Sequence, residues 1–265
     1  MPDIYLCEII ENTLLIDNIY SITIRSRELA QEAVAGQFLH IKCGEARLLR
    51  RPISICYVQD DKVNFVFETK GEGTKWLSRC TPGQKLDILG PLGNGFQLPE
   101  GNIIVVGGGV GTPPMLFVAQ SAKSSVTAVL GFREAKRVIL TDEFKKVCDE
   151  VYITTDDGSV GIHGFVTEPL EELLKTRKYS AVMTCGQIIM QKAVAELCDK
   201  YNIPLQVSLE ERMGCGVGAC LVCACAIRSD KNIDVDKTAG VTSDGVEMKR
   251  ACIDGPVFNA KDVVW

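Results

Sequence analysis

The fold of this chain is decided by the stretch IIVVGGGVGTPP, Ile103–Pro114, where an apolar run meets a glycine-rich turn and two prolines. Such a run is typical of a buried parallel strand, and proline is favoured in the first turn of a helix. A turn between strand and helix is where α/β sheets receive a pyrophosphate, although Thr112 replaces the third glycine of the usual fingerprint. We predict that Gly107, Gly109, Gly111 and Thr112 bind a nicotinamide dinucleotide; a purely structural tight turn is the alternative.

Downstream of this turn, buried strands alternate with longer helical patterns, which predicts a parallel sheet with helices on both faces. The expected strands are 103–106, 126–130, 151–154, 181–184 and 205–209, and the expected helices are 114–122, 142–148, 167–174 and 187–201. We assign residues 99–210 to this nucleotide-binding α/β domain. Cys185 ends the fourth strand at the carboxyl edge of the sheet, so it is a candidate to contact the nicotinamide ring; a buried small residue is the alternative.

Upstream of the turn, short segments of alternating polarity are separated by Gly, Asn and Asp turns, as at 19–24, 37–41 and 63–67. This spacing predicts a small antiparallel β-barrel. Glycines and prolines then become frequent, and we place the domain boundary between Gly95 and Gly101, which assigns residues 1–98 to the barrel.

Two short motifs in the barrel are candidates for binding a flavin dinucleotide. Arg51 in the segment RRPIS (50–54) can contact a pyrophosphate with two hydrogen bonds, and Ser54 can bond a ring nitrogen of the flavin. Gly73 and Thr74 open a short helix whose free N–H groups suit phosphate oxygens. Each motif is weak on its own.

The cysteines are the strongest signal in the chain. Of the 12 cysteines, Cys215, Cys220 and Cys223 have the C-x4-C-x2-C spacing of a plant-type [2Fe–2S] site. The fourth ligand is either Cys225 or Cys252, and we favour Cys252 because a turn that can close the site follows it. Structural zinc and a disulfide are the alternatives, but zinc usually takes two matched pairs of cysteines. Residues 211–265 are therefore assigned to a cysteine-rich iron–sulfur tail.

Composition excludes other classes of protein. The net charge of -5 is spread over mixed segments, so no basic stripe suits a nucleic acid. The N-terminus lacks the features of a signal peptide, and the longest apolar stretch is broken by glycine and proline, so we expect a cytoplasmic protein without a membrane span.

Taken together and in this order, the Arg51–Ser54 strand, the Gly73-Thr74 helix start, the glycine turn and Cys185-Gly186 resemble the ferredoxin-reductase family. The tail segments 209–223 and 252–258 are similar to the electron-transfer subunits of type B dihydroorotate dehydrogenases. Two features depart from that family: the stretch Ala224–Ala251 is longer than usual, and Gln187 follows Cys185-Gly186 where Pro or Ala is common.

The resemblance implies three cofactors, FAD, a [2Fe–2S] cluster and diffusible NAD. It implies electron transfer from dihydroorotate oxidation, in an FMN-containing catalytic subunit, to NAD+ during pyrimidine biosynthesis. It also implies a heterotetramer with two copies of each subunit. The residues that match the family's FAD site are Arg51, Pro52, Ile53, Ser54, Val66, Phe67, Glu68, Gly73 and Thr74, and those that match its cluster ligands are Cys215, Cys220, Cys223 and Cys252.

Two other functions are weighed against this one. An NAD(P)H-linked reductase subunit of a sulfhydrogenase or ferredoxin-dependent transhydrogenase would share the flavin domain, the glycine turn and the cluster. Those relatives tend to have a shorter first cysteine gap than the one between Cys215 and Cys220. A non-catalytic, zinc-stabilised binding module is the other alternative.

Overall fold

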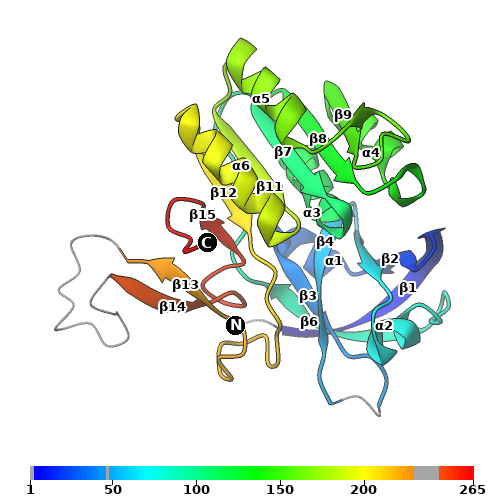
Figure 1. The fold of residues 1–265 in the computed structure, drawn as a ribbon. Helices are drawn as coiled ribbons and strands as arrows, with labels where there is room; N and C mark the ends of the chain where they lie inside the picture. Colours follow the sequence, from blue (N-terminus) through cyan, green and yellow to red (C-terminus); the bar gives the residue numbers. More distant parts are fainter. Residues whose placement is uncertain (1–2, 46–47, 230–244) are drawn as a thin grey trace.

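The computed structural model describes residues 3–45, 48–229 and 245–265, and the described chain begins with a closed antiparallel barrel (Figure 1). The strands follow the order β1-β2-β5-β4-β3-β6 around the barrel. Their bounds are β1 Asp3–Ile16, β2 Ile19–Arg25, β3 Phe38–Ile41, β4 Arg51–Gln59, β5 Lys62–Glu68 and β6 Lys85–Leu92. Two short helices, α1 (Arg27–Glu32) and α2 (Glu72–Leu77), lie in the connections.

The barrel closes because β-branched and aromatic side chains occur at alternate positions and fill its interior. Ile22 on β2 lies opposite Phe65 on β5, and both side chains are fully buried. Period-two alternation places every second side chain on the same face of a strand, and closure removes the unpaired edges of the sheet. The predicted antiparallel barrel is confirmed.

The second part is a seven-stranded sheet in the order β10-β9-β8-β7-β11-β12-β15, parallel except for β15. Its strands are β7 Ile103–Gly108, β8 Val126–Phe132, β9 Glu150–Thr155, β10 Ile162–His163, β11 Ala181–Cys185, β12 Leu205–Ser208 and β15 Val257–Asn259. Its helices are η1 Gly109–Gly111, α3 Thr112–Ser121, η2 Ala135–Arg137, α4 Thr141–Val147, α5 Thr167–Thr176 and α6 Ile188–Lys200.

Helices cover both faces of this sheet, as the sequence pattern predicts (Figure 1). Ile103 and Val105 of β7 belong to the core that includes α3 and the barrel, whereas Ile104 and Val106 belong to the core that includes α5 and α6. On the barrel side, Gln120 of α3 exchanges two hydrogen bonds with the backbone of Val58 on β4. The sheet is therefore apolar on both faces, and α3 joins it to the barrel.

The tail packs against both of the other parts. Strands β13 (Ala224–Arg228) and β14 (Val246–Arg250) form an antiparallel hairpin, and β15 pairs with β12 at the edge of the sheet. The backbone N–H of Asn94, after the barrel, donates to the Gly255 carbonyl at 2.6 Å. These tail strands were not expected, and part of the long stretch Ala224–Ala251, residues 230–244, lies outside the described residues.

Among the residues that the structure describes, no helix combines the length and apolar character needed to cross a membrane.

Candidate functional site

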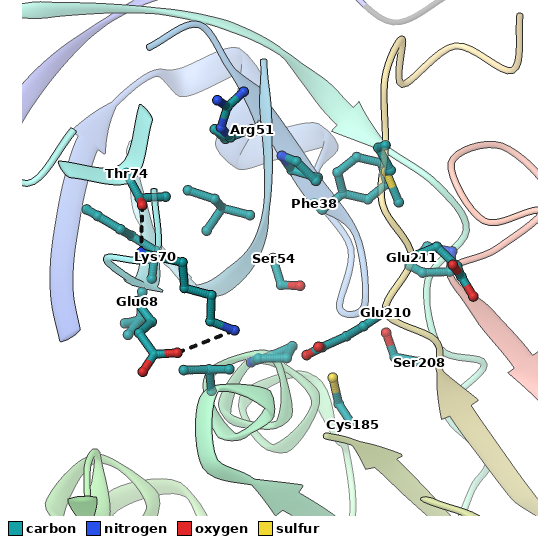
Figure 2. Close-up of a pocket in the computed structure, with 18 of the residues that line it drawn as sticks. Phe38, Arg51, Ser54, Glu68, Lys70, Thr74, Cys185, Ser208, Glu210 and Glu211 are labelled. Carbon is teal, nitrogen blue, oxygen red and sulfur yellow. Dashed lines mark hydrogen bonds and ion pairs between the residues drawn. The ribbon is translucent and has the colours of Figure 1, made fainter. Parts of the chain in front are cut away.

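A cavity of about 370 Å³ lies between the barrel and the α/β domain, and most of the predicted cofactor residues line it (Figure 2). Strands β4 and β5 form one wall, and the ends of β11 and β12 form the other. The predicted residues that line it are Arg51, Pro52, Ile53, Ser54, Val66, Phe67, Glu68, Thr74 and Cys185. Gly73, Gly107, Gly109, Gly111 and Thr112 are not part of its lining, but Gly73 lies against Arg51 and Gly111 against Cys185, which are.

At the barrel end of the cavity, Arg51 lies against the first turn of α2. A Cβ on Gly73 would lie 2.7 Å from the Arg51 Nε, so only glycine leaves room for the guanidinium there. The Thr74 hydroxyl accepts the backbone N–H groups of Lys70 (3.0 Å) and Gly71 (3.2 Å), which closes the turn before the helix. Thr74 therefore fixes the first turn of α2, and the Arg51 guanidinium lies against this turn.

Glu68 joins the barrel to the α/β domain at the cavity wall. Its carboxylate lies 2.9 Å from Arg137 on η2 and 3.4 Å from the ammonium of Lys70 (Figure 2). Lys70 lines the cavity and was not anticipated from the sequence. Lys70 and Arg51 both line the cavity, and their positive charges suit an anionic ligand.

The glycine turn after β7 lies directly against the end of β11. A Cβ on Gly111 would overlap the carbonyl of Cys185, and one on Gly107 would lie 2.8 Å from the Thr112 Cα. Gly109 has a φ of +53°, in the left-handed region that favours glycine. The Thr112 hydroxyl is buried and has no hydrogen-bond partner among the described residues.

Cys185 is buried at the sheet side of the cavity, and its thiol stays protonated. Burial raises the pKa of Cys185 to about 12, and the nearby Glu210 carboxylate acts in the same direction. The residue therefore offers a neutral apolar contact rather than a thiolate nucleophile.

Glu210 is a site residue to which the sequence assigned no role. Its carboxyl is accessible from the cavity and points between Ser54 and Cys185 (Figure 2). Enclosure by the cavity walls raises the pKa of the Glu210 carboxyl. The positive charge of Lys70 acts in the opposite direction but is the smaller effect. A single carboxylate has no spacing pattern, so only the folded chain reveals it.

Gln191 on α6 is a second residue that the sequence did not single out. Its buried amide nitrogen donates to the carbonyls of Gly186 (2.7 Å) and Ser208 (3.0 Å). One side chain thus fixes the ends of β11 and β12, where Cys185 and Ser208 line the cavity.

The four predicted cluster ligands are brought together as two pairs of thiols. Cys215 is hydrogen-bonded to Cys220, and Cys252 to Cys223. Although burial opposes it, hydrogen bonds from the N–H groups of residues including Val217 lower the pKa of Cys215 to about 6. Among the described residues, no three or more His, Cys, Asp or Glu side chains are grouped closely enough to hold a metal ion, so the structure shows the four thiols only as two pairs.

The Cys225 thiol has a backbone hydrogen-bond partner and is not paired with any of these four thiols. It lies on β13 opposite Lys249, and its Sγ is 3.5 Å from the Lys249 carbonyl oxygen. Cys252 follows β14, and the N–H of Ala251 donates to the Cys223 carbonyl at 2.9 Å. Two thiol pairs, small residues between the first two ligands and N–H groups directed at sulfur all fit a [2Fe–2S] cluster.

The barrel, the α/β domain and the cavity between them define the class, a flavoprotein of the ferredoxin-reductase fold. A solved structure of NADH-dependent reduced ferredoxin-NADP oxidoreductase is similar over 98% of this chain and 90% of its own, with 30% identity and a TM-score of 0.83. A ferredoxin NADP+ reductase from Neisseria gonorrhoeae, with bound FAD and NADP, shares the fold over 75% of this chain and 91% of its own, at 18% identity and a TM-score of 0.62.

Sequence relatives identify the family within this class. Residues 210–264 match the iron-sulfur cluster binding domain of dihydroorotate dehydrogenase B. The chain is 38% identical to the dihydroorotate dehydrogenase B (NAD(+)) electron transfer subunit of Desulforamulus reducens over 100% of both chains. It is also 38% identical to that of Clostridium perfringens, over 96% of this chain and 95% of the relative. The chain belongs to the family of dihydroorotate dehydrogenase B electron transfer subunits.

Proposed function

We propose that this chain carries electrons from dihydroorotate oxidation, which occurs in a separate catalytic subunit, through a [2Fe–2S] cluster and FAD to NAD+ in pyrimidine biosynthesis. The observation that carries the proposal is the cavity between the barrel and the sheet, with the paired thiols of the tail packed against the same barrel. In this division, residues 1–98 hold FAD, residues 99–210 receive NAD and residues 211–265 hold the cluster.

The barrel wall supplies the contacts for FAD. Arg51 presents its charge to the pyrophosphate at the start of α2, and the Ser54 hydroxyl faces the space for the flavin ring. The apolar side chains of Val66 and Phe67 form a wall that excludes water from the ring. When bound, FAD supplies chemistry that exchanges electrons one at a time with a cluster and two at a time with NAD.

The sheet wall supplies the contacts for NAD. The glycine turn from Gly107 to Gly111 offers backbone N–H groups for the pyrophosphate just before α3, whose residues Pro113 and Pro114 have none. Cys185 provides a small, uncharged contact for the nicotinamide ring, and Gln191 holds the strand end that presents it. Glu210 places a carboxylate beside this contact, where it can hold or release a proton.

The tail supplies the contacts for the cluster. Cys215, Cys220, Cys223 and Cys252 would hold the two irons, because they provide two thiolates for each. The N–H groups of Val217 and Ala219, at 3.4 and 3.3 Å from the Cys215 Sγ, stabilise negative charge on that sulfur.

We further propose that the partner is an FMN-containing catalytic subunit, joined to this chain in a heterotetramer with two copies of each. Relatives are named electron transfer subunits of dihydroorotate dehydrogenase B, which implies a separate catalytic subunit. Apart from the antiparallel barrel, the described residues form no barrel of alternating strands and helices that could bind dihydroorotate.

The alternative with specific support is an NAD(P)H-linked reductase subunit of a ferredoxin-dependent transhydrogenase, because the similar structure with a TM-score of 0.83 is that of an NADH-dependent reduced ferredoxin-NADP oxidoreductase. The relatives that match the full length, together with the four-residue gap between Cys215 and Cys220, favour the dihydroorotate dehydrogenase. A non-catalytic, zinc-stabilised module would not account for the cavity between the barrel and the α/β domain.

The test is reconstitution of the chain with the FMN subunit encoded in the same organism. The mixture should reduce NAD+ with dihydroorotate, whereas each subunit alone should not. FAD, iron and acid-labile sulfide should co-purify with this chain. If the loaded chain restored NAD+ reduction only with reduced ferredoxin, and not with the FMN subunit and dihydroorotate, the transhydrogenase would replace the proposal. Zinc without flavin would refute both.

A further inference from the structure

Three neighbouring strands of the barrel, β1, β6 and β3, present one row of side chains to the outside. Ile4 on β1 lies opposite Leu89 on β6, and Leu89 lies opposite His40 on β3. Residues that are directly opposite in an antiparallel sheet share a face, and their neighbours along each strand point to the other face. The neighbours Leu39 and Ile88 are fully buried in the barrel core, so the row from Ile4 to His40 lies on the outer surface.

The cysteine loop, Cys215–Cys223, covers only one end of this row. A Cβ on Gly216 would lie 2.6 Å from the His40 Nδ1, so the loop packs directly on the buried imidazole. Leu89 is half-buried and packs against the core that the tail shares with the sheet. Ile4, which lies further from the loop, is 66% exposed, and Leu6, the next outward residue on β1, is 65% exposed. The folded chain therefore leaves the β1 end of the row in water.

The cysteine loop has exposed apolar side chains of its own. Val217, next to Gly216, is about half exposed, and Leu221 and Val222 are more than half exposed. Both of these lie between the expected ligands Cys220 and Cys223, and Cys220 is itself exposed. Adjoining exposed apolar residues mark interaction sites on soluble proteins. We call this set the apolar face: Ile4, Leu6, Leu89, Val217, Leu221 and Val222.

We propose that the apolar face is the docking surface for the FMN-containing catalytic subunit, which contacts the barrel through β1 as well as the cysteine loop. The inference rests on the proposed function, because it requires a partner that passes electrons to the tail. A stable interface takes about 20–30 residues from each protein, and the cysteine loop is far shorter than that. A partner seated over Cys220 therefore extends onto the surface beside the loop, where β1 offers Ile4 and Leu6.

Charged residues border the apolar face on the barrel. Leu6 lies opposite Asp87, whose carboxylate is 2.7 Å from the guanidinium of Arg50. The next outward pair on the same two strands is Glu8 and Lys85. An apolar centre with a polar rim is the usual anatomy of an interface between separate chains. The apolar face and its border thus have the composition of a docking site for a folded partner.

The first test measures binding of the FMN subunit from the same organism to the intact chain, loaded with FAD and cluster. Leu6→Asp should raise the dissociation constant on the order of tenfold or more, because it places an unpaired charge in a desolvated contact. The variant should keep its FAD, its iron and its NADH oxidation with an artificial acceptor. Leu14→Asp is the matched control, since Leu14 lies on the same strand, is 52% exposed and is outside the apolar face.

The outcomes separate the docking surface from the proposed function. An unchanged dissociation constant in Leu6→Asp, or an equal rise in Leu14→Asp, overturns the docking surface and leaves the proposed function intact. If the wild-type chain does not bind the FMN subunit, both fail. If Leu6→Asp instead abolishes self-association of the isolated chain and binds the FMN subunit normally, a second copy of the chain occupies the apolar face and the proposal is refuted.

Hydroxyl-radical footprinting of the wild-type chain decides the matter if Leu6→Asp fails to fold. Ile4, Leu6 and Leu221 should become protected from oxidation when the FMN subunit is added, because the partner excludes water from them. Leu14 should stay as reactive as in the free chain. Protection that is confined to the cysteine loop would refute the contact with β1.

Discussion

The carboxylate of Glu68 accepts a hydrogen bond from the guanidinium of Arg137 across the boundary between the barrel and the α/β domain, with 2.9 Å between Oε1 and Nη2. The two side chains are 25% and 31% exposed, so the pair stabilises the domain arrangement by up to about 1 kcal/mol. Arg137→Met should lower the free energy of unfolding by that amount at low salt and by less at high salt. Chemical denaturation at two ionic strengths measures this, with Lys136→Met as the control for lost charge. Equal effects in the two variants would mean that the pair adds nothing.

Arg51→Ala should weaken FAD retention. Loss of a charge-assisted phosphate contact costs about 1.5–3 kcal/mol, which is roughly a ten- to hundredfold rise in the dissociation constant. Lysine at this position should rescue binding only partly, because it cannot form two parallel hydrogen bonds. Flavin fluorescence on dilution measures release, and Arg25→Ala, on the barrel surface, is the control. An unchanged dissociation constant would remove Arg51 from the site.

Cys220→Ser should abolish the visible absorption of the cluster while FAD stays bound. The thiol pairs with Cys215 in the tail, whereas the expected FAD contacts lie in the barrel. Iron, acid-labile sulfide and flavin are each quantified in the purified protein. Cys198→Ser, a buried cysteine on α6, is the control and should keep all three. Full iron content in Cys220→Ser would exclude it as a ligand.

Cys225→Ser should keep its iron and its NADH oxidation with an artificial acceptor, whereas Cys252→Ser should lose the cluster. The Cys225 thiol is directed at the Lys249 carbonyl, but Cys252 is hydrogen-bonded to Cys223. The two variants control for each other, because both replace a buried thiol in the tail. The reverse pattern of iron loss would make Cys225 the fourth ligand.

Gln191→Met should impair the use of NADH more than the retention of FAD. The substitution leaves the carbonyls of Gly186 and Ser208 without their shared donor, which costs about 1–3 kcal/mol. We expect kcat/KM for NADH with an artificial acceptor to fall about tenfold, as 1.4 kcal/mol corresponds to that factor. Gln187→Met, at the exposed start of the same helix, is the control. A loss of FAD equal to the loss in kcat/KM would indicate general unfolding instead.

Periodicity predicted the main elements well. The apolar run at Ile103–Val106 and the turn after it are local features, and they form β7 and the start of α3. The helix begins at Thr112 instead of Pro114, because proline fits the first positions of a helix and does not delay it. Strands β13, β14 and β15 were missed, since the tail sequence is spaced for cysteine ligands and carries no alternating pattern.

The sequence by itself determined the order of the parts and the residues with strong local signals: the cysteine spacing, the arginine–serine motif and the glycine turn. Tertiary structure alone decided which distant residues meet these motifs. His40 and Gly216 are separated by most of the chain, and Glu68 and Arg137 are 69 positions apart, yet the members of each pair are in contact. Periodicity and spacing report only on neighbours along the chain, whereas these contacts depend on how the barrel, the sheet and the tail pack. For that reason Glu210, Gln191 and His40 became visible only in the folded molecule.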